Sequence, residues 1–170
     1  MRRAIRVIAK SEGTPQDVKG TVTLSFEDRF RRRVRLIDDA GEAFMLDLAQ
    51  ATRFEDGDSL ALDAVDGGGV LVVRAALEDV VDAAGLDTQH TARLAWHIGN
   101  RHTPVEVLEN GRLRIQYDHV LAHMLEGLGA TLERKTAPFV PEPGAYDGHG
   151  VAQTDEIEGA AHDHAHSHHR

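Results

Sequence analysis

The chain has 170 residues, of which 28 are acidic and 19 basic, and its formal net charge at pH 7 is −9. This acidic balance argues against nucleic acid as the main partner, because phosphate binding depends on clustered positive charge; it suits cations or a basic protein surface. The chain contains no cysteine, which excludes disulfides and thiolate metal sites, so any bound metal must use nitrogen and oxygen ligands.

The first ten residues, MRRAIRVIAK, do not resemble a secretory signal, because Arg6 and Lys10 interrupt the apolar stretch that such a signal needs. No run in the sequence approaches the roughly 18 apolar residues of a membrane span. We therefore expect a soluble, cytoplasmic protein with no membrane partner.

Residues 1–76 are predicted to form a β-rich domain. Val34 and Leu36 alternate with arginines, which is the period-two pattern of a half-buried strand. Several short strands joined by tight turns indicate a small β sandwich or barrel. The candidate strand segments are 3–9, 20–26, 33–48 and 59–75, the last two each containing a turn.

An arginine cluster lies within this β-rich region, in the segment RFRRRVR. It could contact an acidic partner, but a solvated strand face is the more common meaning of such a cluster. Its members are Arg29, Arg31, Arg32, Arg33 and Arg35.

Residues 77–146 are predicted to form a second domain, in which strands and helices alternate. Asn110-Gly111 is a strong hairpin signal. An apolar stripe at helical spacing marks the second helix, formed by Val120, Leu121, Met124, Leu125 and Leu128. The expected order is strand 78–84, helix 87–100, hairpin 105–117, helix 118–129 and strand 130–136, the ferredoxin-like βαββαβ arrangement of an α+β protein.

Residues 147–170 are predicted to be a disordered tail, because glycine, acids and histidine dominate and little apolar surface is available to offset the entropy of ordering. Clustered imidazoles on such a tail favour binding of nickel, copper, zinc or iron. The alternatives are a solvated tail without function or an expression tag, although a tag is usually unbroken. The candidate metal ligands of the tail are His162, His164, His166, His168 and His169.

Four of the five histidines in the predicted second domain stand out by their positions. His119 and His123 are four residues apart on the second helix, a spacing that can bind a metal but also fits a solvent-facing helix side. His97 is expected on the surface of the first helix, and His102 on a loop before Pro104, where its ring can project freely. From spacing alone, a structural or solvated role is the more common one for both.

Nothing in the sequence predicts catalysis. No serine lies in a Gly-x-Ser-x-Gly turn, and the glycine cluster DGGGV lacks the lysine of a phosphate-binding loop. A metal-dependent hydrolase is disfavoured as well, because no rigid set of three ligands with a base is present. We therefore expect a protein that is not an enzyme.

Three segments, LAWHIGNRHTPVEV, LRIQYDHVLAHMLEGLGATLE and APFVPEPGAY, stand in this order ahead of the histidine-rich end. Together they resemble the UreE family of urease accessory proteins, which are nickel metallochaperones. The resemblance is dense from Leu94 to Tyr146. It is weaker over the first 90 residues, where the strand-rich pattern and the segment FEDRFRRRVRL agree.

The resemblance implies an N-terminal β domain that binds a protein partner and a C-terminal ferredoxin-like domain that dimerises. It implies that His102, in the Gly-Asn-Arg-His motif, lies at the interface of a homodimer whose two copies hold one Ni²⁺, with tail histidines completing or feeding the site. His119 matches a position where some members carry extra histidines, but Tyr117 stands where another member has histidine. The implied partners are the urease accessory GTPase UreG and the urease pre-activation complex.

Two functions remain open at this point. One is a homodimeric nickel chaperone for urease maturation. The other is a general protein-interaction or chaperone module whose tail buffers nickel, zinc or copper, because ligand identity alone does not separate these metals.

Overall fold

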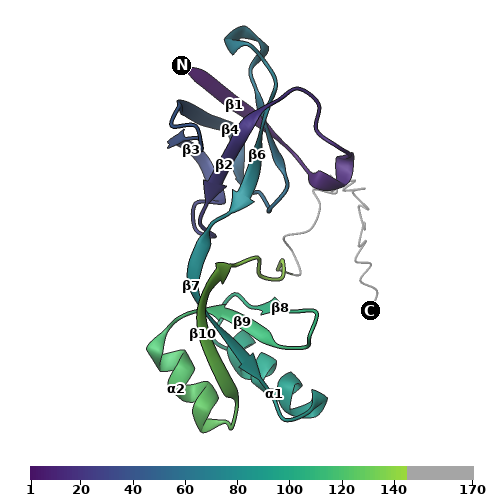
Figure 1. Ribbon diagram of the computed structural model, residues 1–170, viewed down its shortest axis with the longest axis vertical. Helices are drawn as coiled ribbons and strands as arrows, with labels where there is room; N and C mark the ends of the chain where they lie inside the picture. The colour runs from purple at the N-terminus through teal and green to yellow at the C-terminus, as the bar shows by residue number, and fades with distance from the viewer. Residues whose placement is uncertain (145–170) are drawn as a thin grey trace, which may run out of the picture.

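The computed structural model describes residues 1–144, which form two β-sheets that follow one another along the chain (Figure 1). The predicted disordered tail at 147–170 lies outside the described residues. The predicted α+β class is confirmed, since the first sheet contains strands alone and the second carries two helices. Within residues 1–144, no helix combines the length and the apolar character that a membrane crossing requires.

The first sheet contains six strands in the spatial order β2-β6-β5-β1-β4-β3. Two short 3-10 helices, η1 (Lys10–Glu12) and η2 (Ala64–Asp66), lie in its connections. The strands are β1 (Arg2–Ile8), β2 (Val18–Leu24), β3 (Phe30–Ile37), β4 (Ala43–Arg53), β5 (Ser59–Leu62) and β6 (Val70–Ala75).

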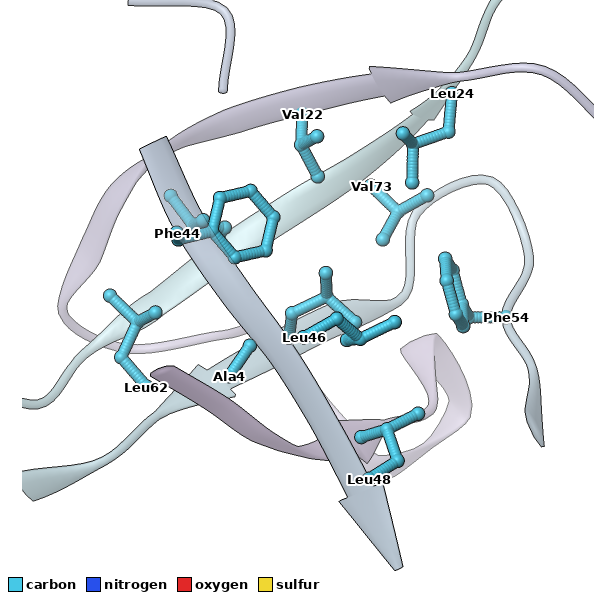
Figure 2. Close-up of a cluster of buried hydrophobic side chains, with 11 residues drawn as sticks. Ala4, Val22, Leu24, Phe44, Leu46, Leu48, Phe54, Leu62 and Val73 are labelled. Carbon is cyan, nitrogen blue, oxygen red and sulfur yellow. The ribbon is translucent and has the colours of Figure 1, made fainter. Parts of the chain in front are cut away.

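The curved first sheet encloses one apolar cluster. Its members are the inward-facing residues of the strands, which alternate with outward-facing ones. Along β4, Phe44, Leu46 and Leu48 are buried while the residues between them are partly exposed. Figure 2 shows these side chains gathered with those of the other strands into a single core. The other buried members are Ala4, Val22, Leu24, Phe54, Leu60, Leu62, Leu71 and Val73.

The turn between β3 and β4 reaches the opposite edge strand of the sheet, β2. Asp39 N donates to Thr21 O at 2.9 Å, and Thr23 N donates to Asp39 Oδ1 at 2.9 Å. The sheet therefore curves until its two edges approach each other, which makes it barrel-like rather than a stack of two sheets.

The second sheet has the order β10-β7-β9-β8, with every neighbouring pair antiparallel. With one helix after β7 and one after β9, this is the ferredoxin-like arrangement that the sequence predicts. Its elements are β7 (Leu77–Ala84), α1 (Thr88–Gly99), β8 (Glu106–Val107), β9 (Leu113–Gln116), α2 (His119–Gly127) and β10 (Thr131–Pro138).

Aspartates cap both helices, and the buried side chains of the helices face the second sheet. Asp87 accepts from His90 N at 2.7 Å, and Asp118 accepts from two amides of the first turn of α2. Leu125 is fully buried, but Val120, predicted to share its stripe, is 61% exposed. That prediction is wrong because five residues along a helix amount to a rotation of about 140° away from Leu125.

A separate small cluster joins the two sheets. Phe26, which follows β2, meets Phe139, which follows β10, edge to face at 5.3 Å between ring centroids. Val80 and Ala137 of the second sheet pack against this pair. The expectation that the arginine cluster is one solvated face is wrong for Arg29, which lies fully buried at this junction.

Candidate functional site

His102 lies on the loop between α1 and β8, just after the helix ends. Its backbone φ is 55°, in the left-handed region that few residues other than glycine adopt. His102 N donates to Gly99 O at 2.9 Å, which holds this conformation. The side chain is exposed, so the loop holds the imidazole out from the fold in a strained backbone conformation, as many functional residues are held.

His102 lines a hollow of about 380 Å³ between the two sheets. Arg53 stands over the Phe26 ring in this hollow, with its guanidinium carbon 4.4 Å from the ring centroid, so the local cation is directed at an aromatic face. The full lining is Phe26, Arg53, His102, Thr103, Pro104, Val105, Pro141, Glu142, Pro143 and Gly144.

His90, which the sequence did not single out, has the opposite environment to His102. Its Nδ1 accepts from Leu86 N at 2.9 Å, and its Nε2 lies 2.9 Å from Leu128 O. An accepting Nδ1 requires the proton on Nε2, so both ring nitrogens are occupied. His90 therefore fastens the start of α1 to the end of α2 and is not available to a metal.

His97 lies half-buried on α1, as the sequence predicts for a helix-surface position. Its ring meets that of Trp96 edge to face at 4.9 Å, and Trp96 is 63% exposed. His97 and His90 border a second hollow, of about 360 Å³, beside the start of α1. His97 and His102 of one chain therefore line different hollows and do not share one.

His119 and His123 are both exposed on α2, one helical turn apart. No hydrogen bond joins either ring to another residue within the described part of the chain. A rotation of about 100° per residue places both rings away from the buried Leu125. The pair can offer a metal two nitrogens and no more from its own helix.

No group of three or more histidine, aspartate or glutamate side chains within residues 1–144 is arranged to hold a metal ion. The tail ligands predicted from the sequence, His162 to His169, lie outside the described residues. In the described part of one chain, a metal can therefore find one imidazole at His102 or two at α2, and a complete coordination shell needs ligands from elsewhere.

Comparison with known families matches the UreE urease accessory protein N-terminal domain to residues 2–76 and the UreE C-terminal domain to residues 78–170. The urease accessory protein UreE of Ruegeria pomeroyi is 51% identical over 129 residues, which cover 76% of this chain and 81% of the relative. That of Cereibacter sphaeroides is 47% identical over 148 residues, covering 87% and 76% of the two chains. That of Chelativorans sp. is 44% identical over 144 residues, covering 85% and 89%.

The two domain matches together span nearly the whole chain, and the relatives are similar over most of their own lengths. The resemblance seen in the sequence is thereby confirmed. The chain belongs to the UreE family of urease accessory proteins, which are accessory chaperones and not enzymes.

Proposed function

We propose that this protein carries Ni²⁺ for assembly of the urease metallocentre, and that it does so as a homodimer. Residues 1–76 would bind a protein partner, and residues 77–146 would dimerise and hold the metal. The observation that carries the proposal is the state of His102: an exposed imidazole with no hydrogen-bond partner in the described part of the chain, held by a left-handed loop.

Coordination chemistry supports sharing between two copies. One imidazole holds a divalent transition metal weakly, and residues 1–144 of one chain supply no cluster of three ligands. Two copies of His102 would provide two nitrogens, and the tail histidines, His162, His164, His166, His168 and His169, would supply the rest. Ligands on a separate segment can be withdrawn one by one, which permits transfer of the ion.

His119 and His97 are weaker candidates for accessory ligands, because each stands apart from His102. Membership of a urease accessory family supports Ni²⁺ as the metal, while Zn²⁺ and Cu²⁺ suit the same nitrogen ligands. We further propose the GTPase UreG and the urease pre-activation complex as recipients. The cytoplasmic location and the absence of nucleic-acid and membrane partners stay predictions from the sequence.

Calorimetry of the full chain with Ni²⁺, together with the mass of the assembly, tests this function. His102→Ala should abolish the tightest site and leave weaker binding by the tail, whereas His119→Ala, which also removes one exposed imidazole, should leave the tightest site intact. Nickel should dissociate below about pH 6, because imidazoles bind metals only when unprotonated. A monomeric protein, or unchanged tight binding in His102→Ala, would contradict the proposal.

A further inference from the structure

From its last residue, Pro138, β10 continues into a segment that runs between the two sheets (Figure 1). We name residues 138–144 the strap. Arg114 Nη1 of the second sheet donates to Pro138 O at 3.1 Å, and Arg29 Nη2, which follows β2 of the first sheet, donates to Phe139 O. Each sheet thus holds one carbonyl of the strap.

The strap in turn contacts the end of the loop that carries His102, residues 100–105, and the strand β8 that follows this loop. Val140 N donates to Glu106 Oε2 at 3.0 Å, and Glu142 N donates to Val105 O at 2.8 Å. In the other direction, Val107 N lies 3.4 Å from Glu142 Oε1. These contacts join the part of the loop that follows His102 to the strap, so movement of the strap would move the loop.

Arg29 is an unusual anchor, because a buried guanidinium is poorly stabilised there. Its side chain is fully buried, its Nε has no hydrogen-bond partner in the described part of the chain, and its closest carboxylate oxygen, on Glu55, is 3.4 Å from Nη1. Its other partners are the Phe139 carbonyl and the face of the Phe26 ring, whose centroid is 5.8 Å from the guanidinium carbon. Burying a charge with no closer carboxylate disfavours folding, and an apolar side chain of similar length would pack at least as well. Packing alone therefore does not account for an arginine at this position.

We propose that Arg29 is a positioning residue for the metal-binding end of the protein: it holds the Phe139 carbonyl, which fixes the strap, and the strap fixes the His102 loop. The inference rests on the proposed function, in which His102 binds the metal. The first sheet, which contains no histidine, thus sets the geometry of a ligand in the second. Coupling between sites is reciprocal, so metal bound at His102 must also stabilise the strap.

A simpler effect of releasing the strap would be a longer connection to the tail. The separation from the fold to His162 would grow from 18 residues after Gly144 to 24 after Pro138. For a tail that is disordered, as the sequence predicts, effective concentration falls with about the 3/2 power of length, which gives a loss of only about 1.5-fold. A greater loss of nickel affinity must come from the His102 loop itself.

The test uses the full chain with Arg29→Met, which keeps the volume and removes the donor, and Arg29→Lys, which keeps a cationic donor. Arg29→Met should weaken the tightest nickel site by about fivefold or more, within the usual range of coupling between sites. It should also speed hydrogen exchange at the Val140 and Glu142 amides by about tenfold or more, as local opening becomes easier. Arg29→Lys should recover part of both effects.

Leu71→Ala is the matched control, because Leu71 is fully buried in the core of the first sheet and belongs to a different cluster from the junction. It should lower the melting temperature and leave nickel affinity and strap exchange unchanged. The proposal is overturned if Arg29→Met changes affinity by no more than the 1.5-fold expected from connection length, if strap exchange is unaltered, or if Leu71→Ala weakens nickel binding equally. His102→Ala separates the two proposals: loss of the tight site there, with no effect of Arg29→Met, refutes the role of Arg29 alone.

Discussion

The two sheets of this chain are stabilised by different means and carry different chemistry. The first encloses one apolar cluster, and none of the eleven histidines of the chain lies in residues 1–76. The second packs its larger apolar cluster under the two helices, while its other face buries the carboxylate of Asp82, bound by Arg114 and Lys135, together with the small apolar cluster of the junction.

This difference separates the residues that stabilise the protein from those that could bind metal. Within residues 1–144, the exposed imidazoles lie beside the smaller core, on a loop at His102 and on one helix face at His119 and His123. The first sheet can then be altered in its core with a large effect on stability and little effect on the intrinsic metal affinity of the folded protein. The junction, where Arg29 holds the strap, is the exception that we propose.

The largest expected effect is in the core of the first sheet. Phe44→Ala would leave a cavity among residues that are fully buried, and such substitutions cost about 3–5 kcal/mol of unfolding free energy. Urea unfolding would measure the loss. Ile37→Ala, at a side chain that is 56% exposed, should stay within about 0.5 kcal/mol of wild type. Weaker nickel binding by the folded fraction of Phe44→Ala than by wild type would contradict the separation of the stabilising core from the metal-binding residues.

Asp82→Asn, in the second sheet, should cause the next largest loss of unfolding free energy. Arg114 Nε and Nη2 donate to the two carboxylate oxygens at 2.6 and 3.0 Å, and Lys135 Nζ lies 3.2 Å away. Removing the negative charge deprives the largely buried Arg114 of its carboxylate partner, while Lys135 keeps Glu133 at 2.8 Å, and the loss costs on the order of 3 kcal/mol at neutral pH. Thermal and urea unfolding at pH 7 would give this value, and a loss no greater than that of Ile37→Ala would contradict it.

The same aspartate predicts a dependence on pH. The hydrogen bonds from Arg114 hold the pKa of Asp82 below its ordinary value, although burial opposes this by raising it. The stabilisation is therefore complete above the unfolded pKa of about 4 and is lost as pH falls through the lower folded pKa. The gap in stability between wild type and Asp82→Asn should narrow below about pH 4; a constant gap down to pH 2 would show that ionisation of Asp82 is not its cause.

His90→Ala should have a smaller effect and tests the contrast between two histidines of one domain. It removes the ring that bridges Leu86 N and Leu128 O, so it should cost about 1 kcal/mol or slightly more. The tightest nickel site should remain, as seen by calorimetry of the same sample. Loss of that site in His90→Ala but not in His102→Ala would reverse the roles given to the two rings.

Local patterns in the sequence predicted most of the fold. The alternation of Val34 and Leu36 with arginines, the Asn110-Gly111 turn and the apolar stripe that includes Leu125 are signals that a strand, a hairpin and a helix carry within themselves. The prediction that Val120 is buried with Leu125 was wrong, because an apolar residue of a helix is buried only when it lies on the helix face that packs against the sheet. Burial of Arg29 could not be predicted, since its acceptor, Phe139 O, is 110 residues away.

The exposed loop position of His102 could be predicted from its place before Pro104, but its role as a ligand comes from the family resemblance of the Gly-Asn-Arg-His motif and stays a prediction. The structure adds the left-handed backbone of His102 and the hollow beside it. The role of His90 was missed because one of its ring partners, Leu128, is 38 residues away. Asp87, three residues before His90, indicates a helix cap but gives no information about the ring.

The smallest expected effect separates stability from function at His102 itself. The backbone there has φ 55°, which glycine adopts without strain and alanine does not. His102→Gly and His102→Ala both remove the imidazole, so both should lose the tight nickel site, but the glycine variant should be more stable than the alanine variant by about 1 kcal/mol.

Gly111, whose φ is 77° in the turn before β9, provides the matched control in the same domain. Gly111→Ala should lose about 1 kcal/mol, because alanine is strained where glycine is not. If the two His102 variants unfold at the same urea concentration while Gly111→Ala is destabilised, the left-handed conformation of His102 carries no strain. If glycine stabilises the loop while nickel is lost, then histidine is kept there at the expense of stability, as expected of a residue whose role is to bind.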